Sequence, residues 1–199
     1  APFASPETLF VSPGPVDQFV AGGSSFARIV EKDHYSIRRV EPGGRFREVL
    51  RCAGLRRCSL LSSPKSGELL LTGDVGGDLE RLLRLDPDGS LHTLHQDPDG
   101  VSDLANVVLD PLSGEAVLAS YRSVGPADYA VAAAGRGEVA AIRSQLPKGH
   151  AFGLTVGRTF WLVAETGDRL QHPRWHLFEP HTRRLRSILS SRREQPRGR

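Results

Sequence analysis

Short runs of alternating apolar and polar residues, separated by turn signals, make up most of this chain. In residues 35–50, one such run leads into Glu41-Pro42-Gly43-Gly44 and a second run follows. Proline presets the backbone angle at the first corner of a turn, glycine accepts the next corner, and alternation at period two buries one face of a strand. The same order of strand, acidic residue, proline, turn and strand recurs at residues 83–94, 107–121 and 175–189. The pattern therefore predicts antiparallel hairpins and an all-β fold.

A longer internal repeat groups these hairpins into larger units. Residues 68–74 and 160–168 are both apolar runs that end in Thr-Gly-Asp, at an offset of 94 residues, and a hairpin follows each. Another hairpin lies between them, so the repeating unit is roughly 40 to 50 residues long, as in the blades of a β-propeller. We predict a partial β-propeller of about three to four antiparallel blades. A β-sandwich and a propeller of few blades are the alternative arrangements of the same strands.

Composition shifts divide the chain into three segments. Residues 1–25 contain several prolines and the run Gly22-Gly23, which predicts a loop-rich N-terminal segment with one short strand at residues 9–11. Residues 26–190 carry the propeller-type repeats. Residues 191–199 form a basic tail, or a linker to a C-terminal domain absent from this chain. The alanine-rich stretch 129–145 predicts one short helix.

Charge and composition exclude two classes of partner. The formal net charge is +3, but much of the excess lies in the terminal arginines, and elsewhere arginine alternates with acidic residues. This distribution gives no basic stripe for nucleic acid, and no apolar run approaches the ~18 residues of a membrane span. The chain begins at Ala1 and contains no methionine, so we expect its natural start to lie upstream.

The two cysteines give no metal signature. Five residues separate Cys52 from Cys58, which matches neither a zinc knuckle nor a disulfide framework. Two free buried thiols and one local disulfide remain open.

Three stretches of the chain, taken in order, carry a resemblance to a known family: residues 82–94, residues 101–121 and residues 160–193. Together they resemble the N-terminal propeller of the prolyl oligopeptidase family of serine peptidases, particularly its acylaminoacyl-peptidase-like and dipeptidyl-peptidase-like bacterial members. Residues 122–135 depart from the family, since they lack its Trp-His-x-Leu-Asp-Pro motif. The resemblance implies a propeller that screens access to an α/β-hydrolase domain, whose Ser, Asp and His would cleave peptides.

No serine motif in the chain predicts a nucleophile. The chain has no Gly-x-Ser-x-Gly elbow, and Gly22-Gly23-Ser24-Ser25-Phe26 lacks the second glycine and a following helical pattern. Residues 62–65, Ser-Ser-Pro-Lys, nominally fit Ser-x-x-Lys, but the proline favours a turn over the helix which that motif requires.

Histidines and acidic residues suggest at most one metal site. An odd offset on a strand places His92 and His95 on opposite faces. A larger group of possible metal ligands lies close together in the sequence: His172, His176, His181, Asp168 and Glu179. A hairpin could bring these side chains together at a metal ion. An ordinary antiparallel hairpin without a metal explains the same residues equally well.

The remaining candidate motifs are predicted to be structural. Residues 86–89 and 97–100, both Asp-Pro-Asp-Gly, lack the glutamate of a calcium loop and predict turns. Trp161 and Trp175 lie on predicted strands, where we expect core or blade-packing residues rather than residues that stack on a ligand. We therefore predict no catalytic, cofactor-binding or metal-binding residue in this chain, and no cofactor.

The hypothesis that follows is a noncatalytic propeller portion of a prolyl-oligopeptidase-family serine peptidase. Its partners would be the C-terminal α/β-hydrolase domain and the peptide substrates of the parent protein, to which any hydrolase activity belongs. The alternative is a freestanding propeller-like scaffold that binds a protein or peptide through loops and edges. A truncated relative with an unclosed sheet would instead self-associate.

Overall fold

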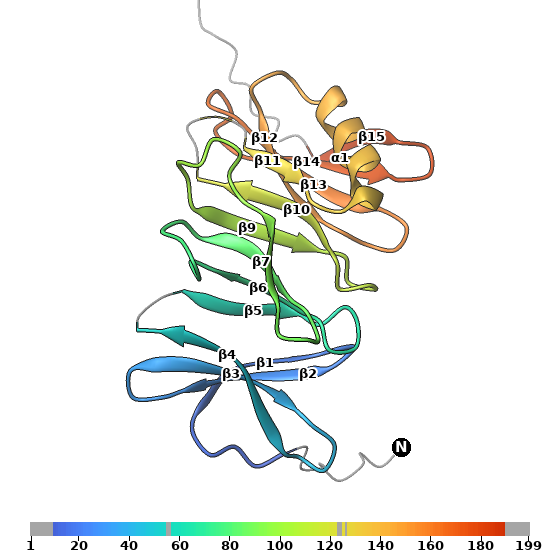
Figure 1. The fold of residues 1–199 in the computed structure, drawn as a ribbon. Coiled ribbons are helices and arrows are strands. Elements are labelled where there is room, and N and C mark those ends of the chain that lie inside the picture. The colour runs from blue at the N-terminus through green and yellow to red at the C-terminus, as the bar shows by residue number, and fades with distance from the viewer. Residues whose placement is uncertain (1–9, 55–56, 123–124, 126, 190–199) are drawn as a thin grey trace, which may run out of the picture. The chain divides into compact units, whose positions relative to one another are not determined.

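The computed structural model describes residues 10–122, 125 and 127–189, except for residues 55 and 56. Within them the chain forms four antiparallel sheets and one helix (Figure 1). The backbone divides into two compact units, Ala1–Asp103 and Leu104–Arg199, which are described separately. The predicted all-β, propeller-type fold is confirmed. In the described part, no helix is long and apolar enough to cross a membrane.

The first unit contains two four-stranded sheets in which neighbouring strands follow each other along the chain. The first sheet consists of β1 (Val16–Ala21), β2 (Ser25–Val30), β3 (His34–Val40) and β4 (Phe46–Ala53). The second consists of β5 (Cys58–Ser62), β6 (Leu69–Gly73), β7 (Arg81–Leu85) and β8 (Leu91–His95).

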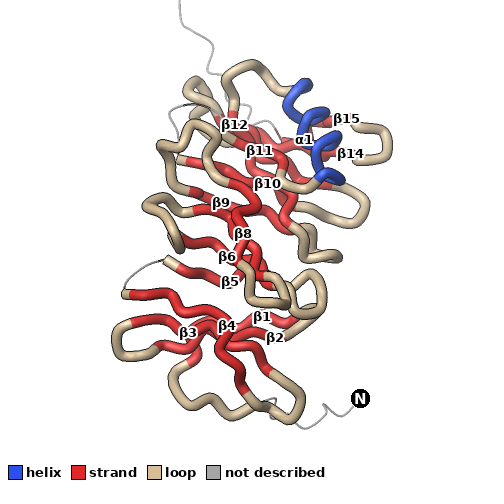
Figure 2. The backbone as a smooth tube through the Cα atoms, in the orientation of Figure 1, coloured by secondary structure: helices blue, strands red, loops and turns tan. Residues whose placement is uncertain are grey.

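The second unit contains a three-stranded sheet, a helix and a four-stranded sheet. Figure 2 shows the strands in red and the helix in blue. The three-stranded sheet consists of β9 (Leu104–Leu109), β10 (Ala116–Tyr121) and β11 (Asp128–Ala130). Helix α1 (Ala133–Gln145) follows. The last sheet consists of β12 (Ala151–Thr155), β13 (Trp161–Thr166), β14 (Arg174–Glu179) and β15 (Arg184–Leu189).

The sheets recur at the interval that the sequence repeat predicts. Their first strands begin at Val16, Cys58, Leu104 and Ala151, at intervals of 42, 46 and 47 residues. The four predicted hairpins are the pairs β3–β4, β7–β8, β9–β10 and β14–β15. The two Thr-Gly-Asp runs end β6 and β13, the second strands of the second and last sheets. Each repeat is thus one up-and-down sheet, as in a propeller blade.

Apolar residues from both sheets of the first unit form one core cluster. It includes Phe26 and Ile37 from the first sheet and Leu69 and Leu71 from the second, each at most 1% exposed. Cys52 and Cys58 lie in the same cluster and form a disulfide, with their Cα atoms 6.3 Å apart. Of the two possibilities that the sequence leaves open, the local disulfide is correct. It links the end of β4 to the start of β5.

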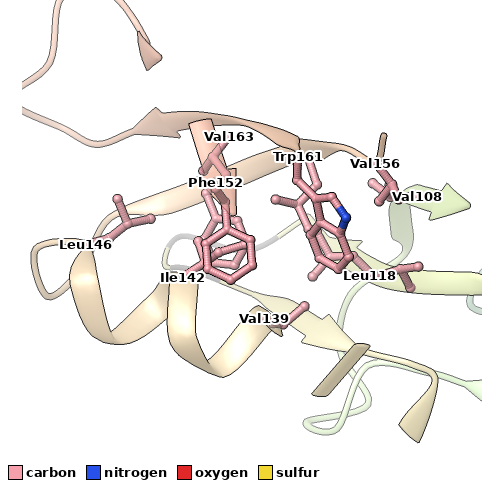
Figure 3. Packing of buried hydrophobic residues seen from close by; sticks show 12 residues of the cluster. Val108, Leu118, Val139, Ile142, Leu146, Phe152, Val156, Trp161 and Val163 are labelled. Carbon is pink, nitrogen blue, oxygen red and sulfur yellow. The ribbon is translucent and has the colours of Figure 1, made fainter. Parts of the chain in front are cut away.

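The core of the second unit joins its two sheets through the helix, as the close view of Figure 3 shows. Val139 and Ile142 from α1 pack with Leu118 from β10 and with Phe152 and Val163 from the last sheet. The predicted core position of Trp161 is confirmed at 8% exposure.

Trp175 lies on a strand, as predicted, but its side chain is 36% exposed, so it is not a core residue. It lies opposite Ala164 on β13, so it points away from the core face that carries Trp161 and Val163.

The predicted N-terminal loop segment contains a strand. β1 covers residues 16–21 and pairs with β2 through the Gly22-Gly23-Ser24 turn, whereas Phe10 and Val11 are not in a strand. The local pattern of β1 is weak because most of its side chains are exposed or half-buried, and its partner strand supplies the pairing. Leu9, the rest of residues 1–9 and the predicted basic tail, residues 191–199, lie outside the described residues.

The helix begins later than its composition predicts. Residues 128–130 pair with β10 as β11, so the helical stretch starts at Ala133 and ends, as predicted, at Gln145. The sheet ladder takes precedence over the local helix propensity there.

Candidate functional site

The serines considered as nucleophiles bond to the backbone of two neighbouring turns. The amides of Gly23 and Ser24 donate to the carbonyl and hydroxyl oxygens of Ser63, at 2.7 and 2.9 Å. The Ser63 hydroxyl donates to the carbonyl of Glu68 at 2.7 Å, and the Ser24 hydroxyl accepts from the amide of Gly67 at 2.8 Å. The Ser-Ser-Pro-Lys motif thus lies in the β5–β6 turn, where it holds the β1–β2 turn.

Replacing Ser63 with alanine is expected to lower the free energy of unfolding by about 1–2 kcal/mol, because the Ser24 amide and the Glu68 carbonyl lose their partner. Urea denaturation followed by circular dichroism measures this change. Ser66→Ala is the matched control, since Ser66 is exposed in the same turn. Equal unfolding midpoints for the two variants would contradict a structural role for the Ser63 hydroxyl.

The Asp-Pro-Asp-Gly motifs form the predicted turns. The amides of Gly89 and Gly100 donate to the carbonyls of Asp86 and Asp97, at 2.9 and 3.0 Å. Both glycines have positive φ, +92° and +67°, which explains why glycine ends each motif.

The histidines do not gather as a metal site would require. His92 pairs with Asp86 at 3.2 Å, and burial lowers the pKa of His95. His172 and His181 are exposed, and Glu179 accepts from the Thr182 hydroxyl. In the part of the chain that the structure describes, no group of three or more His, Cys, Asp or Glu side chains is placed to hold a metal ion.

A buried carboxylate between two imidazoles is the candidate site. Glu165, at 2% exposure, accepts from Nδ1 of His150 at 2.5 Å and from Nε2 of His176 at 2.8 Å. Glu165 follows Trp161 and Val163 on the core face of β13, and all three side chains are buried. We refer to Glu165, His150 and His176 as the imidazole–carboxylate cluster.

Strand register explains why these three side chains meet. Glu165 lies opposite Phe152 on β12 and Arg174 on β14. His150 and His176 are each two residues from one of those partners, which makes them the diagonal neighbours of Glu165 on the same face. A turn with Gly149 at φ +84° brings His150 to the start of β12.

The cluster keeps the carboxylate ionised. Burial alone would raise the pKa of Glu165, but the hydrogen bonds from His150 and His176 outweigh it, and the pKa lies below its ordinary value. An ionised carboxylate only accepts hydrogen bonds, so each imidazole donates one N–H to it. This fixes the orientation of each ring. The arrangement can therefore hold the ends of β12, β13 and β14 together.

Comparison with solved structures gives a likeness of fold. No protein-family model matches the sequence, and no curated protein does. The fold resembles part of a hydrolase. The chain aligns with a solved structure of a puromycin hydrolase mutant complexed with PGG, at 18% identity and a TM-score of 0.49. The alignment covers 88% of this chain and 28% of the hydrolase chain. At this identity the likeness is one of fold, and the hydrolase activity is that of the other protein.

The sequence contained a signal for the cluster that motif searching missed. Glu165 lies 94 residues after Leu71, so the repeat places a carboxylate where the second sheet has a fully buried leucine. A polar residue at a core position requires partners. Without the strand register, however, the two histidines could not be chosen from the seven in the chain.

Proposed function

We propose that this chain is a noncatalytic, propeller-type portion of a serine peptidase of the prolyl oligopeptidase family. The observation that supports it most is the repeat of up-and-down sheets at intervals of 42, 46 and 47 residues. The described residues of the three stretches that resemble the family, 82–94, 101–121 and 160–189, fall within the second, third and last sheets and their connections.

The polar chemistry of the described residues is consistent with a noncatalytic role. The hydroxyls of Ser24 and Ser63 are engaged with backbone groups. The imidazoles of His150 and His176 both donate to one buried carboxylate, between strands of a single sheet. A hydrolytic triad needs a hydroxyl or thiol nucleophile next to the imidazole, as well as a carboxylate that orients it.

In the parent protein, the chain would limit which peptides reach the nucleophile of an α/β-hydrolase domain. That domain would contribute the Gly-x-Ser-x-Gly elbow, which the sequence of this chain lacks. Sheets of this kind restrict access by bulk and by their connecting loops, without touching the reacting atoms. Its partners are therefore the hydrolase domain and the peptides that pass it.

The purified chain is expected neither to hydrolyse N-acyl-aminoacyl and aminoacyl chromogenic substrates nor to react with a serine-directed fluorophosphonate probe. Trypsin, assayed in parallel, is the positive control for both reagents. Intact-mass spectrometry reads the labelling, and heat-denatured chain controls for nonspecific reaction. Stoichiometric labelling that requires the folded chain would overturn the noncatalytic assignment.

A further inference from the structure

A cavity in the first unit has a polar lining that the proposed function does not use. It measures about 410 Å³ and lies between the β6–β7 connection and the segment that follows β8. Its lining combines charged and apolar residues, among them Asp78, Leu79, Arg81, Asp97 and Val101. The apolar part of the lining is accessible to solvent at Val101, whose side chain is 76% exposed.

The β6–β7 connection is built around the guanidinium of Arg81. Nη2 of Arg81 donates to the carbonyl of Val75 at 2.8 Å. A Cβ at Gly77 would lie 2.8 Å from the same nitrogen, so a larger residue there would require the guanidinium to shift. Gly76 has φ +76°, which bends the chain around this side chain.

The guanidinium retains unused hydrogen-bonding capacity. It has five N–H donors, and its Nε–H is buried without an acceptor among the described residues. No carboxylate of those residues forms an ion pair with Arg81. A half-buried guanidinium with a single acceptor favours an incoming anion, and the fork of N–H groups fits a carboxylate.

Two carboxylates also line the cavity, and only one of them is engaged. The carboxylate of Asp97 accepts hydrogen bonds from the amides of Val101, Ser102 and Asp99. Asp78 is exposed, and its carboxylate has no hydrogen-bond or ion-pair partner in the described part of the chain. The cavity is therefore lined by one guanidinium without an ion-pair partner and by one exposed carboxylate, both statements applying to the described part of the chain.

We propose that this cavity binds a free α-amino acid with an apolar side chain. The guanidinium of Arg81 takes the ligand carboxylate, and the carboxylate of Asp78 takes its ammonium group. Leu79 and Val101 contact the apolar side chain. A ligand with both charges fits this lining better than a simple anion, because Asp78 and Asp97 would repel an anion that lacks a compensating positive charge. The inference does not depend on the proposed peptidase function.

Titration calorimetry of the full chain with L-leucine tests the proposal. N-acetyl-leucine lacks the ammonium group and leucinamide lacks the carboxylate. Each is expected to bind roughly ten- to hundredfold more weakly than leucine, the range for a lost hydrogen bond to a charged group. Absence of leucine binding, or equal affinity for the three probes, would overturn the proposal.

The leucine affinity of variants in the cavity lining tests whether leucine binds in this cavity. Arg81→Gln and Asp78→Asn are each expected to weaken leucine binding roughly tenfold or more. Arg45→Gln is the matched control, because Arg45 is exposed in the β3–β4 turn, and it should leave the affinity unchanged. Arg81→Lys keeps the charge but loses the fork, and its expected intermediate affinity provides a second test if Arg81→Gln does not fold. Wild-type affinity in the folded Arg81 and Asp78 variants would contradict the site.

Discussion

Replacing Phe178 with alanine is expected to lower the free energy of unfolding of the second unit by about 3–5 kcal/mol. Phe178 is completely buried on β14, and its ring lies 5.8 Å from the indole of Trp161, opposite it on β13. It belongs to the cluster that joins the two sheets of this unit through α1. Truncation removes apolar contacts and leaves a cavity that strands on both sides cannot fill.

Urea unfolding followed by circular dichroism measures the loss for Phe178→Ala, and the fluorescence of the two tryptophans, Trp161 and Trp175, provides a second signal. Phe160→Ala is the matched control, because Phe160 lies in the same unit but is 43% exposed. It should change the free energy of unfolding much less. Equal losses for the two variants would mean that Phe178 is not a core residue.

Replacing Glu165 with glutamine is expected to cost about 1.5–3 kcal/mol of stability at pH 7, because the hydrogen bonds from His150 and His176 lose their charged acceptor. The effect should depend on pH. The pKa of Glu165 is lowered in the folded protein from a reference of 4.5. The carboxylate therefore contributes stability above pH 4.5, and that contribution is lost as pH falls through the folded-state pKa.

The difference between wild type and Glu165→Gln should accordingly be largest near neutral pH and shrink in acid. Urea denaturation at a series of pH values measures it. Glu115→Gln, at a half-buried position in the β9–β10 turn, is the control for a carboxylate outside the imidazole–carboxylate cluster. A constant difference across the acidic range would show that the charge of Glu165 does not stabilise the cluster.

The periodic part of the fold could be predicted from the sequence because its signals are local. Proline, aspartate and glycine at fixed positions identify the hairpin turns, and the two Thr-Gly-Asp runs give the repeat. The register that places strands beside each other is a nonlocal property. The edge strand β1, with mostly exposed side chains, and the late start of α1 were missed for that reason.

The candidate sites were less predictable than the strands. The imidazole–carboxylate cluster depends on diagonal contacts across two strand pairs, which a search for spaced motifs cannot detect. The cavity beside Arg81 depends on a turn that folds around a side chain, and only Gly76-Gly77 indicates it in the sequence. The exposure of Trp175 could not be predicted, because alternation identifies two faces of a strand but not which of them is buried.

The most direct test of the account is fluorophosphonate labelling of the protein encoded by the entire reading frame that contains this sequence, followed by peptide mapping. We expect one labelled serine, in a Gly-x-Ser-x-Gly elbow beyond Arg199, and no label within these 199 residues. A labelled serine within this chain, or a reading frame that contains no hydrolase domain, would contradict the proposal.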